Sequence, residues 1–146
     1  LNVYGLPTAE KRMKLVIEFM KSILSMKPPW LVWVAGLMGL NMVGPLFFIQ
    51  TPEAQAVLAA TLAGAIFMMF LFSRYGFVRL LGLGHIFWVP LVVWLWGRSS
   101  EIGLNTTFGI WLTSVLVVNI LSLIIDLIDV SLYIRGDRRP MEIASS

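Results

Sequence analysis

The sequence predicts an all-α integral membrane protein, built as four transmembrane helices in an antiparallel bundle and preceded by an amphipathic helix at the membrane interface. Of the 146 residues, 58% are hydrophobic and 13% are charged, and the mean hydropathy is +0.85. An average soluble domain has about 25% charged residues. Four apolar stretches are long enough to cross about 30 Å of hydrocarbon. We expect the spans at about residues 30–49, 54–72, 77–96 and 108–133.

The positions of the basic residues predict one orientation for these spans. Ten of the eleven Lys and Arg residues precede the first span, lie near the link between the second and third, or follow the fourth, whereas Arg98 lies on the opposite side. By the positive-inside rule both termini are cytoplasmic, and we expect the protein in the cell inner membrane. The expected domains are an N-terminal segment at 1–27, the transmembrane domain at 28–134 and a cytoplasmic tail at 135–146.

An amphipathic helix is expected to begin at Thr8 and to end before Pro28. Its apolar residues recur at helical spacing on one face, and its basic residues fill the other. Two placements use the apolar face equally well: the helix lies in the membrane interface, or it packs across the ends of the spans. Basic side chains near both ends of the chain are expected to contact anionic lipid headgroups. These are Lys11, Lys14, Arg135, Arg138 and Arg139.

The first two spans carry signals of bending and packing. Gly44-Pro45 predicts a kink near residue 42, because proline removes a backbone donor and clashes with the preceding turn. The kink either exposes carbonyl groups to a site or is an ordinary bend, and we favour the bend. In the second span, Ala56, Ala60 and Gly64 place a small residue at every fourth position, which predicts close helix contact near its beginning.

The third span combines charged and helix-weakening residues. It contains Arg79, the only histidine, His85, and the pair Gly82-x-Gly84. On one continuous α-helix, a separation of six residues places Arg79 and His85 about 120° apart. The glycines indicate close packing and not a dinucleotide-binding loop, because no strand precedes them and no acidic partner follows.

A polar stripe runs along the fourth span, within a sequence otherwise rich in Ile, Leu and Val. Its members recur at spacings of three and four residues, which places them on one face of a helix. A narrow polar face on an otherwise apolar helix is typical of side chains that point at protein or water within a membrane. The polar stripe consists of Asn119, Ser122, Asp126, Asp129 and Tyr133.

Two contacts follow from comparing depths between antiparallel spans. Arg79 lies near the start of the third span, level with Asp129 near the end of the fourth. His85 lies roughly 9 Å deeper, near Asp126. A carboxylate at mid-helix costs about 2.5 to 3.5 kcal/mol on insertion scales, so both are expected to be paired, protonated or hydrated. Asn41 adds a further polar group in the first span.

These polar groups leave three functions open. In the first, the chain is a proton- or cation-handling channel or transport component, with His85 and Asp126 in a water-filled cleft and the small-residue face of the second span at a homo-oligomer interface. In the second, Arg79 and Asp129 fix helix register in a non-catalytic structural or assembly subunit of a larger membrane complex. In the third, an intramembrane enzyme uses Asp126, Asp129 and His85 on a lipid-like substrate. Polar groups at several depths favour the first, and so sparse a site disfavours the third.

Other classes of site are excluded or disfavoured. The chain has no cysteine, which excludes disulfides, thiolate catalysis and iron–sulfur ligation, and we expect no cofactor and no metal. The net charge of +3 forms no continuous patch, so the expected partners are anionic lipids and another membrane subunit or copy, and not nucleic acid. His85 and Trp88 could line a chromophore or quinone site, but core packing is the favoured interpretation.

Overall fold

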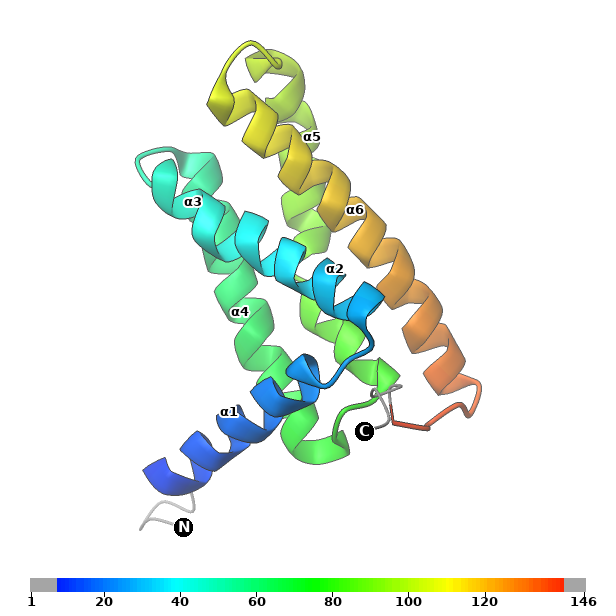
Figure 1. Cartoon of the computed structure of the whole chain (residues 1–146). Helices are drawn as coiled ribbons and strands as arrows, with labels where there is room; N and C mark the ends of the chain where they lie inside the picture. The colour runs from blue at the N-terminus through cyan, green and yellow to red at the C-terminus, as the bar shows by residue number, and fades with distance from the viewer. Residues whose placement is uncertain (1–7, 141–146) are drawn as a thin grey trace.

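The computed structural model describes residues 8–140, which form an all-α bundle (Figure 1). This part of the chain contains six α-helices, one π-helical turn (η1) and one 3₁₀-helix (η2). The all-α class predicted from the sequence is confirmed. The elements are α1 Ala9–Leu24, α2 Pro28–Met38, η1 Gly39–Val43, α3 Gly44–Phe47, α4 Pro52–Tyr75, η2 Arg79–His85, α5 Trp88–Ile102 and α6 Thr107–Ile134.

Among residues 8–140, three stretches of helix are long and apolar enough to cross a membrane. They are Pro28–Phe47, which joins α2, η1 and α3, and the helices α4 and α6. A fourth is present if η2 and α5, which are bent by 46° relative to one another, are counted as one span. By length and composition, these spans indicate a small polytopic integral membrane protein.

The third predicted span is not the continuous α-helix that the sequence analysis assumed. Its first half is the 3₁₀-helix η2, a turn follows at residues 86 and 87, and α5 continues to Ile102, beyond the predicted end at residue 96. Gly82 and Gly84 explain the weak first half, because glycine is among the poorest α-helix formers. Pro90 lies in the first turn of α5, where a backbone donor has no partner within the helix.

The first span changes its helical geometry near residue 42, where the sequence predicted a kink. The N–H of Gly44 donates to the carbonyl of Gly39, five residues earlier in the chain, whereas an α-helical N–H donates to the carbonyl four residues earlier. Pro45 has no N–H to donate to the carbonyl of Asn41, so an α-helical bond is missing at this point. The wider π-helical turn η1 accommodates this loss and places Asn41 inside the bundle.

Close contact between α4 and η2 holds the middle of the bundle together. A Cβ atom added to Gly64 would lie 2.5 Å from the carbonyl oxygen of Gly84, so the two backbones touch. Ile66 and Phe70, in the bulky second half of α4, are exposed, as expected for lipid-facing side chains. The buried apolar core is formed by Leu37, Ala54, Val57, Trp88, Leu91, Leu95, Trp111, Leu112, Val115 and Leu116.

Helix α1 projects from the end of the bundle at which α4 finishes (Figure 1). Its N-terminus is capped by the hydroxyl of Thr8, which accepts a hydrogen bond from the N–H of Lys11. The ring of Phe19 packs edge-on against Phe72, with 5.2 Å between centroids. Most of the predicted apolar face of α1 remains uncovered, and Met13 and Leu24 are each more than 60% exposed. The helix therefore touches the end of α4 and also presents an apolar surface.

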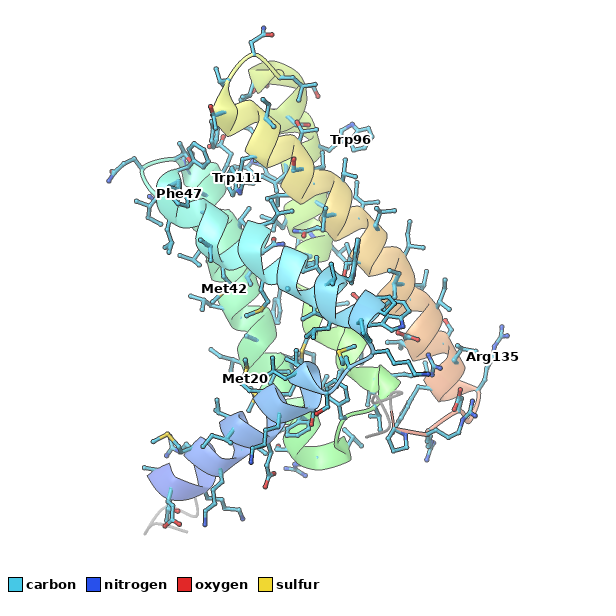
Figure 2. All side chains as sticks on the ribbon, viewed as in Figure 1. Met20, Met42, Phe47, Trp96, Trp111 and Arg135 are labelled. Carbon is cyan, nitrogen blue, oxygen red and sulfur yellow. The ribbon has the colours of Figure 1, made fainter. Side chains whose placement is uncertain are left out.

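The two ends of the bundle differ in the side chains that they expose. Figure 2 shows Phe47 and Trp96 pointing outward near one end and Arg135 at the other. We call these the Trp96 end and the Arg135 end. Aromatic and basic side chains are both typical of positions near a membrane interface.

Candidate functional site

The candidate site lies where η2 packs against the polar stripe of α6. A 3₁₀-helix has three residues per turn, so Arg79, Gly82 and His85 fall on one face of η2. This corrects the expectation that Arg79 and His85 lie about 120° apart, which holds only for an α-helix. A Cβ atom added to Gly82 would lie 3.0 Å from Oδ1 of Asp126. Glycine therefore allows η2 to approach α6 closely at this position.

The first contact of the site joins His85 to Asp126. Nδ1 of His85 lies 2.7 Å from Oδ2 of Asp126, and the side chains are 21% and 16% exposed. A proton on Nδ1 can donate to the carboxylate in either the neutral or the charged form of the imidazole. The same ring stacks on the buried Trp88, with 4.1 Å between centroids. The structure contains the contact that the depth comparison predicted, whereas its functional role stays a prediction.

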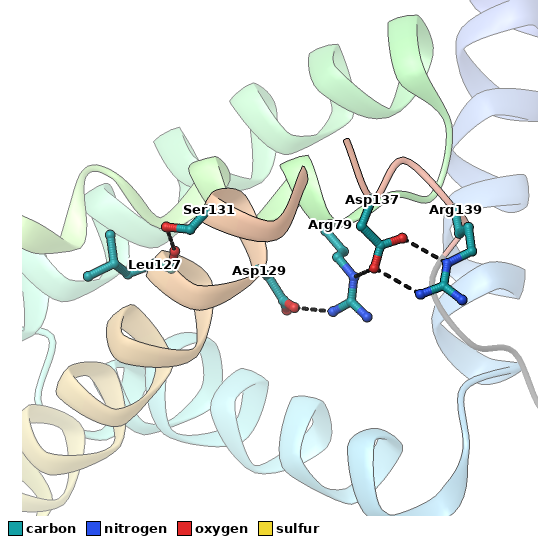
Figure 3. Close-up of polar contacts among 6 residues, drawn as sticks. All are labelled: Arg79, Leu127, Asp129, Ser131, Asp137 and Arg139. Carbon is teal, nitrogen blue, oxygen red and sulfur yellow. Dashed lines mark hydrogen bonds and ion pairs between the residues drawn. The ribbon is translucent and has the colours of Figure 1, made fainter. Parts of the chain in front are cut away.

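The second contact is a cluster of ion pairs around Arg79 (Figure 3). Nη1 of Arg79 donates to the carboxylate of Asp129, as the depth comparison predicted. Nε of the same guanidinium lies 3.4 Å from Asp137, a residue that the sequence analysis did not single out. Asp137 also accepts two hydrogen bonds from Arg139, at 2.8 and 3.0 Å. Arg79 therefore links η2 both to α6 and to the segment that follows α6.

The electrostatics of Asp137 reflect these partners. The hydrogen bonds from Arg139 and the positive charges of Arg139 and Arg79 lower the pKa of Asp137 from 3.8 to about 2. The Asp137 carboxylate is therefore charged at neutral pH. Arg139 was predicted to contact lipid headgroups; its side chain is 83% exposed, so that contact stays compatible with its bonds to Asp137.

A pair of buried amides joins the first and fourth spans. Nδ2 of Asn41 donates to Oδ1 of Asn119 at 2.9 Å, and Nδ2 of Asn119 donates back at 2.8 Å. Both side chains are almost fully buried. Nearby, Nε1 of Trp111 donates to the carbonyl of Leu40, which is freed from regular helical bonding by the π-helical turn. Both asparagines were predicted from the sequence as polar sites, but their pairing was not predicted.

The remaining members of the polar stripe also face protein. Ser122 is buried in α6, one turn after Asn119 and one turn before Asp126. Tyr133, near the end of the helix, lies under the guanidinium of Arg138, with 5.5 Å between the guanidinium carbon and the ring centroid. The polar stripe is therefore directed into the bundle at one end and covered by an arginine at the other.

A third charged cluster, at the Trp96 end, was missed by the sequence analysis. Nε of Arg98 donates to Glu53 at 2.7 Å, and the Glu53 side chain is only 3% exposed. Arg98 also binds Glu101. A signal was present in the sequence: these three residues are the only charged ones on their side of the predicted bundle. A buried carboxylate needs a partner, and Arg98 was the only basic residue available.

Two shallow grooves on the bundle are lined mainly by apolar side chains. One groove of about 240 Å³ lies between α2 and Val118, and another of about 320 Å³ lies between Leu104 and α6. Neither groove includes a residue of the His85 or Arg79 contacts. Within residues 8–140, no group of three or more His, Cys, Asp or Glu side chains could hold a metal ion.

No family model, curated protein or solved structure matches the chain. What the chain does must therefore be inferred from its own geometry. That geometry offers a hydrogen-bonded imidazole and carboxylate in the membrane region, next to a break in a helix. Such a pair can hold a proton and can exchange it with water if water reaches it.

Proposed function

We propose that the chain is a four-span membrane protein in which His85 and Asp126 bind and release a proton, as the site of a proton- or cation-handling transport component. The four spans are Pro28–Phe47, α4, η2 with α5, and α6, arranged antiparallel. Both termini are cytoplasmic in this proposal, and the membrane is the cell inner membrane. The Arg135 end is then the cytoplasmic end.

The observation that carries the proposal is the position of this pair at the break between η2 and α5. His85 is the last residue of η2, and the chain turns by 46° before α5 begins. Irregular backbone at membrane depth is tolerated where protein buries it or where it lines a water-filled cavity. Transporters commonly build their binding sites at such broken helices. Histidine is also the side chain whose charge changes most readily near physiological pH.

The depth of the pair supports a role within the membrane. Asp126 precedes the end of α6, at Ile134, by eight residues, which corresponds to about 12 Å along the helix. That distance lies within one half of a hydrocarbon layer about 30 Å thick. Because both side chains of the pair are partly exposed, solvent or lipid can reach them from outside the bundle.

The other half of the bundle is closed by apolar side chains. Val57, Leu95, Leu112 and Val115 are fully buried between the His85–Asp126 pair and the Trp96 end. Beyond them, Arg98 and Glu53 join α5 to α4. In this arrangement the pair communicates with the cytoplasmic end, and movement of an ion to the opposite face requires a conformational change or an oligomer. We propose a homo-oligomer for this reason.

The placement of α1 belongs to the same proposal. Its exposed apolar face, with Met13 and Leu24, suits the acyl boundary of the cytoplasmic leaflet, while Lys11 and Lys14 suit anionic headgroups. The contact between Phe19 and Phe72 fixes the helix at the end of α4. Arg135 and Arg138 are exposed at the same end of the bundle.

A second candidate function is a non-catalytic assembly subunit of a larger membrane complex. The buried amide pair of Asn41 and Asn119 favours it, because these side chains satisfy one another and fix the register of two spans without reaching water. Stable co-purification with a different membrane protein, combined with the absence of ion flux from the chain alone, would support this candidate.

The test of the transport proposal is flux through purified protein in liposomes. Vesicles containing a pH-sensitive dye report proton entry, and a potassium gradient with an ionophore supplies the driving force. Wild-type protein is compared with Asp126→Asn, which keeps the shape of the side chain and removes its charge. Glu101→Gln is the matched control, because it makes the same chemical change at an exposed residue of the opposite end.

A further inference from the structure

We infer that Asp137, in the segment after α6, is a positioning residue for the His85–Asp126 pair: through Arg79 it holds η2 in the 3₁₀ geometry that places His85 against Asp126. This inference rests on the proposed function for its significance, since the pair it positions is the proposed proton site. The contacts on which it depends stand independently of that function.

The geometry of η2 needs support from outside the helix. It runs for seven residues, whereas 3₁₀-helices longer than three or four residues are uncommon because their hydrogen-bond geometry is poorer. If the segment relaxed to an α-helix, Arg79 and His85 would lie about 120° apart. Only one of them could then face α6. The simultaneous contacts of Arg79 with Asp129 and of His85 with Asp126 therefore depend on the 3₁₀ geometry.

Asp137 contacts the beginning of η2 from the segment that follows α6. Arg79 is the first residue of η2, and its guanidinium lies between Asp129 and Asp137 (Figure 3). If Asp129 were its only partner, the flexible side chain of Arg79 could keep that ion pair while η2 rotated about its axis. With Asp137 as a second partner, Nη1 and Nε of the guanidinium are each paired with a different carboxylate, and rotation would break one of the two ion pairs.

The segment that carries Asp137 is itself fixed. Gly136 has φ +108°, a left-handed conformation that turns the chain at the end of α6 and that glycine adopts without strain. The N–H of Asp137 donates to the carbonyl of Leu132 at 3.0 Å. Pro140 forms an antiparallel bridge with Val78, the residue immediately before η2. The segment is therefore docked on the beginning of η2 at two points, Arg79 and Val78.

The test uses the single histidine as a probe. Because His85 is the only histidine, full-length protein labelled with ¹⁵N-histidine, purified without a histidine tag and placed in lipid vesicles, reports its imidazole alone. In the wild type we expect one ¹⁵N signal for Nδ1 with the shift of a hydrogen-bonded nitrogen. Asp126→Asn identifies that signal, because it must move when the carboxylate is lost.

Asp137→Asn is expected to split the Nδ1 signal into hydrogen-bonded and free populations. Asp137→Glu is expected to restore the single signal, because a carboxylate can still reach Arg79, and Glu101→Gln is expected to leave it unchanged. If Asp137→Asn does not fold, Arg79→Lys is expected to cause the same splitting, because a single ammonium group replaces the two nitrogens that pair with Asp129 and Asp137. An unchanged Nδ1 signal in the folded Asp137→Asn protein, or in Arg79→Lys if that is the variant measured, overturns the inference.

The outcome is separable from that of the transport proposal. Full flux in Asp126→Asn liposomes would reject transport by this pair and leave the positioning role of Asp137 intact. An unchanged Nδ1 signal in Asp137→Asn, with flux lost in Asp126→Asn, would reject the positioning role alone.

Discussion

Nδ1 of His85 and Oδ2 of Asp126 are 2.7 Å apart, where the end of η2 meets the polar stripe of α6. This contact depends on two local features of η2. It requires the glycine at position 82, which lets the two backbones approach, and the three-residue turn of η2, which brings His85 to the same face as Arg79. The site is therefore a consequence of a backbone irregularity.

The ion pair between Arg79 and Asp129 is expected to contribute to stability as a unit. Arg79→Ala or Asp129→Ala leaves a partly buried charge with fewer partners and is expected to cost about 1–3 kcal/mol of folding free energy. The double variant should recover part of the loss, because no unpaired charge remains between the two positions. Folded yield in detergent and the midpoint of denaturation measure both effects. Strictly additive losses would show that the two residues do not interact.

The buried amides of Asn41 and Asn119 are also expected to stabilise the fold as a pair, although neither side chain is charged. Asn41→Leu or Asn119→Leu leaves the other amide unsatisfied among apolar side chains, at a cost of about 1–3 kcal/mol. The double leucine variant should be more stable than either single variant. Thermal unfolding in detergent gives the comparison. Ser114→Ala, at a partly buried position of the same helix where the hydroxyl bonds only to the carbonyl of Ile110, is the control for general effects on α6.

The contribution of Asp137 to the free energy of unfolding is expected to depend on pH. Its pKa is lowered from 3.8 to about 2, so the carboxylate stabilises the folded chain at pH values above about 3.8, and this stabilisation is lost as the pH falls towards about 2. The difference in unfolding midpoint between wild type and Asp137→Asn should therefore be constant from neutral pH down to about pH 5 and shrink below that. A difference that grows on acidification would contradict the assignment of its partners.

The proposed orientation can be tested with single cysteines, because the chain has none of its own. Ser100→Cys, at the Trp96 end, is expected to react with a membrane-impermeant maleimide added outside intact cells. Arg135→Cys is expected to react only after permeabilisation. Reaction of both variants from outside, or of Arg135→Cys alone, would reject the arrangement with both termini in the cytoplasm.

Much of the site could be predicted because charge is scarce in this chain. With one histidine and few carboxylates in the apolar runs, the depth comparison left few possible partners for Arg79 and His85. The 3₁₀ geometry of η2 could not be predicted in the same way. The third span is apolar on nearly every side, so no periodic pattern distinguishes three residues per turn from 3.6. Glycines at 82 and 84 indicated close packing without indicating which helical geometry would result.

The contacts that were missed have a different cause. Glu53 follows Pro52 in what the sequence presented as a short link, and its burial depends on α4 beginning at that proline and on α5 reaching past Arg98. The pairing of Asn41 with Asn119 depends on the π-helical turn of the first span. Both results come from where helices begin, end or change geometry, and these boundaries are the features that sequence patterns define least well.

Proton flux in liposomes is the decisive measurement, because it reports directly what the His85–Asp126 pair is proposed to do. We expect flux from wild-type protein and from Glu101→Gln, and loss of most of that flux in Asp126→Asn at equal amounts of folded protein. Full flux from Asp126→Asn, matching the wild type in the same vesicles, would contradict the proposal.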